Sequence, residues 1–274
     1  MALITPGSRT GVTSDSLRRI WAEAAGVRMH ARSGGKRSSA SPPLILLHGL
    51  SISSRYMADL AAEAAGWTLV HALDLPGFGL SGNPATVLDI PGLADATAAW
   101  IATNELPPPI VLGNSVGSQI AVNLAARYPD QLAGIVLTGL ALGGQRRSGL
   151  SQVVRVLADA PREPLRLWPM QAQDFIRARP WRVVQTFRLA LHDRIGMSIP
   201  RVTVPTLVVE GTNDPLDDPG WNRVLVRQLA CGRLAVVEGG THALPMSRPV
   251  ALSALVREFA AEIAAGTRGV RQAG

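Results

Sequence analysis

The chain has 274 residues, of which 47% are hydrophobic and 17% are charged. This balance excludes a disordered chain, and the length suits a single α/β domain that carries an insertion. Cys231 is the only cysteine, which excludes a disulfide framework and any cysteine-rich metal site.

The formal net charge is +7, but its distribution does not favour nucleic-acid binding. Lys36 is the only lysine, and the arginines are scattered along the chain without an interleaved aromatic platform. No apolar run is long enough to span a membrane, and the first residues lack the pattern of a secretory signal. We therefore expect a cytoplasmic protein with no nucleic-acid partner and no membrane span.

Short apolar runs bounded by turn residues recur along the chain, and they are typical of strands buried in a parallel sheet. Segments with helical spacing lie between most of them, so right-handed crossovers and a doubly wound α/β sheet are expected. An antiparallel hairpin over 19–24 and 27–31 precedes this sheet. The six runs are Leu44–Leu47, Thr68–Leu73, Ile110–Leu112, Ala133–Thr138, Thr206–Val209 and Leu234–Val237.

One long interval, between Thr138 and Thr206, interrupts this alternation. It contains two apolar stripes at helical spacing, and a structureless loop of this length would be unusual. We expect residues 141–200 to form a small helical cap inserted into a core made of residues 1–140 and 201–274. The first stripe is Leu150, Val153, Val154 and Leu157, and the second is Trp181, Val184, Phe187, Leu191 and Ile195.

The third of these strands runs into Gly113-Asn114-Ser115-Val116-Gly117 and then into a helix. This is the G-x-S-x-G pattern in a strand–turn–helix context, where a sharp turn projects the serine hydroxyl from the sheet. Side chains two residues to either side would collide, so both positions need glycine. The pattern predicts Ser115 as a nucleophile and the N–H of Val116 as an oxyanion donor.

A serine hydroxyl needs a base, and this chain offers five histidines. His242 lies in a loop at the carboxyl end of a strand, where active sites gather in open α/β sheets, and is the predicted base. His30 and His71 lie inside predicted strands, and His192 lies on the polar side of a cap helix. His48 ends a strand before a glycine and is expected to order that turn.

The base in turn needs an acid that orients its ring. Asp214 follows the strand Thr206–Val209 and is the predicted acid, whereas Asp217 and Asp218 are expected to be solvated or to cap the next helix. The predicted order Ser115, Asp214, His242 is the order of a serine-elbow hydrolase.

A second oxyanion donor is expected in the loop after the first strand of the parallel sheet. Gly49 lets the chain bend inward there, which places the N–H of Leu50 toward Ser115.

These motifs together resemble the α/β-hydrolase family: LLHGL at 46–50, DLPGFGLSG at 74–82, GNSVG at 113–117, GTNDP at 211–215 and GGTHALP at 239–245. The resemblance covers nearly the whole chain. It implies a mostly parallel eight-stranded sheet flanked by helices, a small helical cap, and hydrolysis through an acyl-enzyme without a cofactor or metal. It also implies that GFGLSG is a loop beside the active site rather than a dinucleotide site, since no helix opens on its third glycine.

Most small family members with a serine nucleophile hydrolyse carboxylic esters, so the expected substrate is a small-molecule carboxylic ester. The protein is expected to be a monomer or a homodimer. One alternative is cleavage of a carbon–carbon bond in a vinylogous diketo acid, because GNSVG resembles the elbow of such hydrolases and Arg177, Arg182 or Arg188 could hold a substrate carboxylate. Ala243 stands where those enzymes commonly carry tryptophan. Another alternative is a ligand sensor that keeps the triad and signals through its lid.

Overall fold

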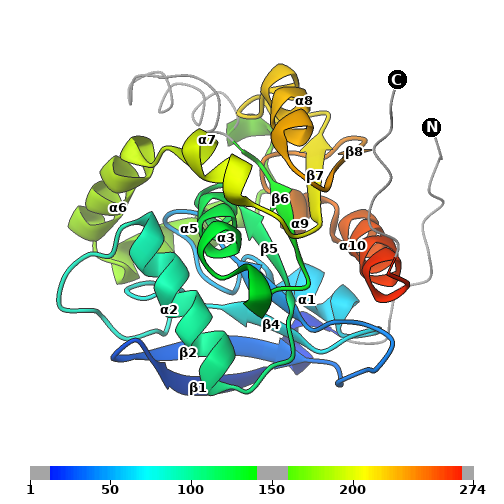
Figure 1. Cartoon of the computed structure of the whole chain (residues 1–274). Coiled ribbons are helices and arrows are strands. Elements are labelled where there is room, and N and C mark those ends of the chain that lie inside the picture. The colour runs from blue at the N-terminus through cyan, green and yellow to red at the C-terminus, as the bar shows by residue number, and fades with distance from the viewer. Residues whose placement is uncertain (1–12, 141–159, 267–274) are drawn as a thin grey trace.

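The computed structural model describes residues 13–140 and 160–266, which form one sheet with helices on both faces (Figure 1). The strand order is β1-β2-β4-β3-β5-β6-β7-β8. β1 pairs antiparallel with β2 and β2 antiparallel with β4, whereas the remaining pairs are parallel. The strands are β1 (Arg18–Ala24), β2 (Val27–Gly34), β3 (Leu44–Leu47), β4 (Val70–Leu73), β5 (Ile110–Asn114), β6 (Gly134–Thr138), β7 (Thr206–Gly211) and β8 (Gly232–Val237).

This sheet confirms the predicted fold class, the hairpin and the six predicted strands. One expectation about the strands is wrong, because β8 is not buried on both faces. It lies at the edge of the sheet, and Val236 is 57% exposed. An apolar run therefore marks the strand but does not show how many faces are covered.

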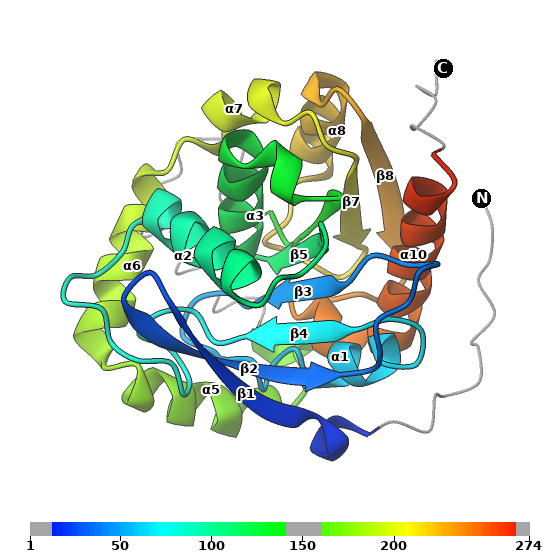
Figure 2. The same cartoon turned by 60° about the horizontal axis from the view of Figure 1, so that its bottom comes forward.

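Helices separate most of the strands, and none of those described is long and apolar enough to cross a membrane. Helices α2 and α3 cover one face of the sheet, and α1 and α10 cover the other (Figure 2). The helices are α1 (Ala58–Ala64), α2 (Ile90–Thr103), α3 (Val116–Arg127), α5 (Leu167–Arg177), α6 (Pro180–His192), α7 (Ile195–Ser198), α8 (Pro219–Gln228), α9 (Leu244–Ser247) and α10 (Pro249–Ala264); 3₁₀ turns lie at Ser14–Ser16, Pro129–Gln131, Ala160–Arg162 and Ile199–Arg201.

Alternation along the central strands builds a separate hydrophobic core on each face of the sheet. In β3, Ile45 and Leu47 pack into the core with α2 and α3, whereas Leu44 and Leu46 pack into the core with α1 and α10. Because both faces are covered, the strands read as continuous apolar runs in the sequence. The sheet is thus a rigid platform for the loops at its strand ends.

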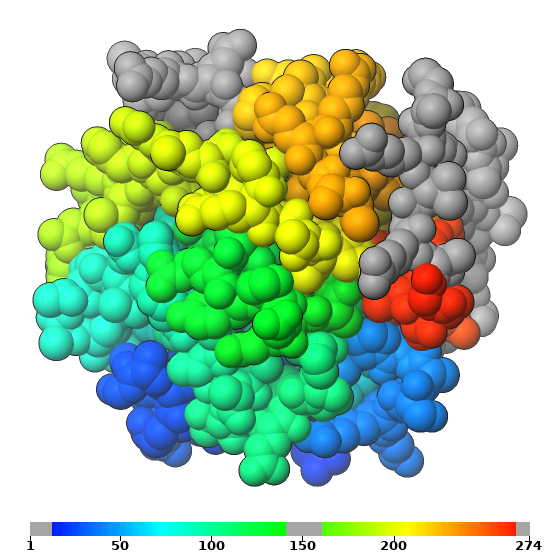
Figure 3. All heavy atoms as spheres, in the orientation of Figure 1, coloured from blue at the N-terminus to red at the C-terminus, as the bar shows by residue number. Residues whose placement is uncertain are grey.

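Among the described residues, α5, α6 and α7 lie between β6 and β7 in the chain. Helices α5 and α6 lie beyond the carboxyl ends of β3 and β4 (Figure 2), and the segment from α6 to α7 borders α2 and α3 as a band on the surface (Figure 3). The first predicted apolar stripe, from Leu150 to Leu157, lies outside the described residues.

The second predicted stripe is only partly correct, although Pro180 does begin α6 as expected. Ile195 is buried and Phe187 and Leu191 are half-buried, but the first two residues of the stripe face outward. Trp181 and Val184 are 51% and 47% exposed. The face of α6 that packs inward instead carries Arg182, Val183, Thr186 and Ala190. The buried face of α6 therefore carries polar as well as apolar side chains.

Candidate active site

Ser115 lies at a sharp turn between β5 and α3, with φ of +57°. This left-handed conformation is strained for a residue with a side chain, and it lifts the serine out of the strand direction. A Cβ atom at Gly113 would lie 2.2 Å from the carbonyl oxygen of Gly117, and one at Gly117 would lie 2.3 Å from that of Leu47. The two glycines therefore permit the turn, as the sequence predicts.

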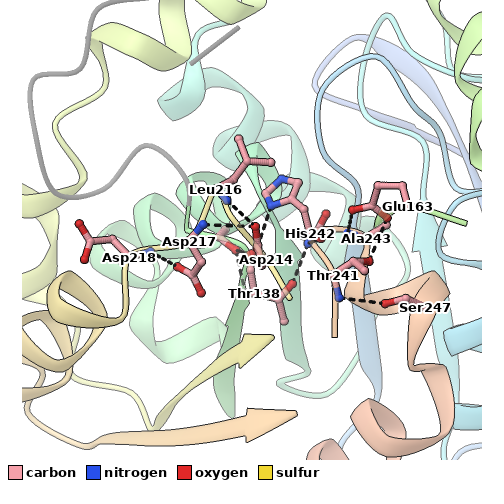
Figure 4. Close-up of polar contacts among 12 residues, drawn as sticks. Thr138, Glu163, Asp214, Leu216, Asp217, Asp218, Thr241, His242, Ala243 and Ser247 are labelled. Carbon is pink, nitrogen blue, oxygen red and sulfur yellow. Dashed lines mark hydrogen bonds and ion pairs between the residues drawn. The ribbon is translucent and has the colours of Figure 1, made fainter. Parts of the chain in front are cut away.

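The structure brings Asp214 and His242 together at the ends of two neighbouring strands, and Figure 4 shows their side chains pointing toward each other. Nδ1 of His242 lies 2.9 Å from Oδ2 of Asp214. The other carboxylate oxygen accepts hydrogen bonds from the N–H groups of Leu216 and Asp217, at 2.8 and 3.2 Å. Because both oxygens have partners, the carboxylate is held in one orientation. It favours the tautomer whose proton is on Nδ1, which leaves Nε2 as the basic nitrogen of the ring.

Asn114 connects the serine turn to the histidine loop, a role that no sequence pattern predicted. Its Nδ2 donates hydrogen bonds to the carbonyl oxygen of His242 and to Oγ1 of Thr138, at 3.1 and 3.0 Å. Its Oδ1 accepts from the hydroxyl of Tyr56 at 3.0 Å. Since Asn114 directly precedes Ser115, these bonds fix the position of the histidine loop relative to the serine turn.

The predicted oxyanion loop also lies against the serine turn. A Cβ atom at Gly49 would be 3.2 Å from the Cβ of Ser115, so the two backbones approach closely. In the described part of the chain, neither the N–H of Leu50 nor that of Val116 donates to another backbone group. Both donors thus belong to segments next to the serine.

His48 orders this loop, as predicted, and the structure shows how. The N–H of Leu75 donates to its Nε2 at 3.1 Å, so the proton of the neutral ring is on Nδ1, which lies 2.7 Å from the carbonyl oxygen of Gly49. Burial lowers the pKa of the His48 imidazole. The neutral ring thereby joins the oxyanion loop to the loop after β4.

The two aspartates after Asp214 differ from each other. Asp218 caps α8 as predicted, accepting a hydrogen bond from the N–H of Trp221 at 3.1 Å. Asp217 is not solvated, because it is 6% exposed and accepts from Nδ2 of Asn222 at 2.8 Å. Burial, followed by the negative charge of Asp214, raises the pKa of Asp217 to about 6.

Glu163 is a further polar residue at this site that no sequence pattern predicted. It lies in the segment that leads into α5, and it is 8% exposed. Its carboxylate accepts hydrogen bonds from Oγ1 of Thr241 and from the N–H of Ala243, each at 2.9 Å, and so brackets His242 on both sides (Figure 4). No local pattern marks this residue, because its partners lie about eighty positions away.

The three cap arginines named as possible carboxylate ligands lie in different environments. Arg177 and Arg188 are exposed, whereas Arg182 is 4% exposed. The guanidinium of Arg182 lies against Gly77, in the loop after β4, where a Cβ atom would be 2.8 Å from its Nη1. Nε of Arg182 has no hydrogen-bond partner among the described residues. Of the three, only Arg182 is held inside the protein.

Among the described residues, no group of three or more histidine, cysteine, aspartate or glutamate side chains is arranged to hold a metal ion.

The loop containing Gly77 and Gly79 opens no helix on Gly82, as expected from its sequence.

Comparisons with known proteins identify the family of this chain. A model of the alpha/beta hydrolase family matches residues 44–255. A pimeloyl-[acyl-carrier protein] methyl ester esterase of Neisseria meningitidis is 30% identical over 78% of this chain and 91% of its own length. A monoacylglycerol lipase of Mycolicibacterium smegmatis is 30% identical over 68% of this chain and 75% of its own. The fold is similar to that of the enol-lactonase from Burkholderia xenovorans LB400, with a TM-score of 0.75, 23% identity, and coverage of 88% of this chain and 99% of that one.

Proposed function

Since this chain belongs to the alpha/beta hydrolase family and is a hydrolase, we propose that it cleaves a small-molecule carboxylic ester through an acyl-enzyme. Ser115 is the nucleophile, His242 the general base and Asp214 the acid that orients the base. The observation that carries this proposal is the 2.9 Å bond between His242 Nδ1 and Asp214 Oδ2. The carbonyl oxygen of His242 also accepts a hydrogen bond from Asn114, the residue that precedes the serine held at φ of +57°.

In the acylation step, Nε2 of His242 accepts the proton of the Ser115 hydroxyl while Oγ attacks the ester carbonyl. Asp214 stabilises the imidazolium that forms. The protonated histidine then donates its proton to the alcohol that leaves, and the serine remains acylated. Water, activated by the same histidine, releases the acid and restores the hydroxyl of Ser115.

The negative charge that develops on the carbonyl oxygen needs two donors. The N–H groups of Leu50 and Val116 suit this role, because they flank Ser115 and have no backbone acceptor within the described residues. The start of α3 adds a favourable dipole at the same place. Because both donors are backbone groups, the oxyanion site depends on loop geometry rather than on side-chain identity.

Covalent labelling tests this assignment directly. A fluorophosphonate probe should add one phosphonyl group to the wild-type chain, and peptide mass spectrometry should locate the adduct on Ser115. Ser115→Ala should take up no label and should hydrolyse p-nitrophenyl butyrate at least about 10³-fold more slowly. Labelling of another residue, or wild-type turnover by Ser115→Ala, would contradict the assignment.

A substrate that carries a carboxylate is a second candidate, and the burial of Arg182 favours it. No carboxylate among the described residues forms an ion pair with Arg182. A buried guanidinium is costly without an anionic partner, and a substrate carboxylate would compensate its charge. We propose that residues 141–200 form the cap that brings this arginine to the substrate. Arg182→Gln should then lower kcat/KM for a vinylogous diketo acid or a dicarboxylate monoester but not for p-nitrophenyl butyrate, whereas Arg188→Gln should change neither.

A further inference from the structure

One cavity lies apart from the predicted catalytic residues, none of which lines it. Its volume is about 380 Å³, and its walls come from the β1–β2 hairpin, the loops after β3 and β4, and α5. Four arginines and a single aspartate contribute to the lining, an excess of three positive charges. We refer to the cavity as the arginine pocket, defined by Arg19, Arg32, Arg55 and Arg177.

Two of these arginines form an unfavourable pair in the sheet. Arg19 on β1 lies directly opposite Arg32 on β2 in the antiparallel register. Like charges at opposed positions destabilise a strand pair. In the described part of the chain, no carboxylate forms an ion pair with either side chain, and Nε of Arg32 is buried without a hydrogen-bond partner. The protein thus maintains a repulsive contact that a bound anion would relieve.

The acidic side chains near the pocket are already engaged by other groups. Asp74 accepts hydrogen bonds from the N–H groups of Ser54 and Leu80, at 2.6 and 2.7 Å, and contacts Nδ1 of His30 at 2.8 Å. Asp174 lies 3.5 Å from Nη1 of Arg55 and accepts from the hydroxyl of Ser53. These carboxylates therefore fix the pocket walls, and within the described residues neither of them forms an ion pair with Arg19 or Arg32.

The wall also holds a buried donor. Ser54 lines the pocket and is 1% exposed, yet its hydroxyl has no hydrogen-bond partner among the described residues. A buried hydroxyl without a partner is costly, and a ligand oxygen would satisfy it. This is independent of the charge pattern, and both observations indicate an acceptor-rich ligand.

We propose that the arginine pocket binds a phosphorylated small molecule through its phosphate groups. Guanidinium groups match phosphate oxygens in a bidentate geometry, and a phosphate monoester carries close to two negative charges, more than a single carboxylate. A cavity of about 380 Å³ also accommodates an organic group beyond the phosphate.

The full chain should be titrated with inorganic pyrophosphate by calorimetry, with thermal unfolding measured in parallel at constant ionic strength. Wild type should bind one pyrophosphate, and its Tm should rise more than with sulfate or citrate. Arg32→Gln and Arg177→Gln should each raise the Kd at least about tenfold. Arg188→Gln and Arg201→Gln, which change exposed arginines outside the pocket, should retain wild-type affinity.

Arg32→Gln carries a second readout. Without ligand, its Tm should be no lower than that of wild type, because the substitution removes the repulsion from Arg19. If Arg32→Gln does not fold, Arg177→Gln is sufficient to test the site, because Arg177 is exposed on α5.

Three outcomes would overturn the proposal: pyrophosphate binding no tighter than sulfate, tighter binding of citrate, or equal losses in the Arg188→Gln control. Ser115→Ala should bind pyrophosphate as wild type does, so failure of the catalytic assignment and failure of this site are separable.

Discussion

The carboxylate of Glu163 accepts a hydrogen bond from the N–H of Ala243 at 2.9 Å and thereby ties the segment before α5 to the loop that carries His242. The second oxygen accepts from the hydroxyl of Thr241 at the same distance. The proposed base is therefore held from two directions: Asp214 fixes its ring and Glu163 fixes its backbone. Glu163 is a positioning residue, because it acts through the loop and contacts neither the ring nor a substrate.

Glu163→Leu should lower kcat by about 10- to 100-fold with little change in KM, because a histidine displaced by a fraction of an ångström transfers protons poorly. Glu163→Gln should restore most of the activity, since its amide oxygen can accept from Ala243 while its NH₂ donates to the hydroxyl of Thr241. Steady-state kinetics and Tm should be measured for both variants. Equal losses of kcat in the two would contradict positioning by these hydrogen bonds.

Asp214→Asn should lower kcat by about 10⁴-fold, because an amide cannot hold the imidazole in the reactive tautomer or stabilise its protonated form. Asp217→Asn and Asp218→Asn are matched controls, and each should retain kcat within about tenfold. Nδ1 of His242 lies against the carboxylate of Asp214, whereas the carboxylate of Asp217 accepts from Asn222. Asparagine at 218 also caps a helix well. Kinetics with p-nitrophenyl butyrate compare the three variants. Should Asp217→Asn be the one that loses activity, the assignment of the acid moves to Asp217.

Gly117→Ala should destabilise the fold by at least about 2 kcal/mol, because the new methyl group would overlap backbone that cannot move aside. Its Cβ would lie 2.3 Å from the carbonyl oxygen of Leu47. At Gly196 the nearest atom would be 3.8 Å away, on Trp221, so Gly196→Ala should be neutral or stabilising. Urea unfolding followed by circular dichroism gives both values. A Gly117→Ala variant as stable as wild type would show that the turn does not need its glycine.

Asp193 should make stability depend on pH. Burial is the main cause that raises its pKa from 3.8 to about 6. The hydrogen bond from Asn123 lowers the pKa, and the negative charge of Asp89 raises it further. The folded chain therefore holds the Asp193 proton to higher pH than the unfolded chain does. The contribution of this proton to the free energy of unfolding is fully present below about pH 3.8 and is lost as the pH rises through about 6.

Asp193→Asn removes this titration. The free energy of unfolding of the variant, minus that of wild type, should increase between pH 4 and pH 7 and then level off, as measured by urea unfolding across that range. Asp130→Asn, at an exposed position, provides the reference. A difference that stays flat, or that falls as the pH rises, would contradict the raised pKa of Asp193.

The amino-acid sequence by itself determined the strands, most of the helices and their assembly into an α/β sheet. Those features depend on the alternation of apolar and turn residues within short windows, which is local information. The glycines at 113 and 117 were also predictable, because the turn that needs them lies within five consecutive residues. The pairing of Asp214 with His242 was predictable because the ends of adjacent parallel strands meet at one edge of a sheet.

Only the tertiary structure decided which side chains are buried at contacts between distant segments. Arg182 rather than Trp181 packs inward, Asp217 is enclosed rather than solvated, and Glu163 reaches the histidine loop from the segment before α5. The arginine pocket likewise assembles from the hairpin, two loops and α5. Burial and charge pairing depend on the element that packs from the other side, and a side chain's sequence neighbours do not specify that element.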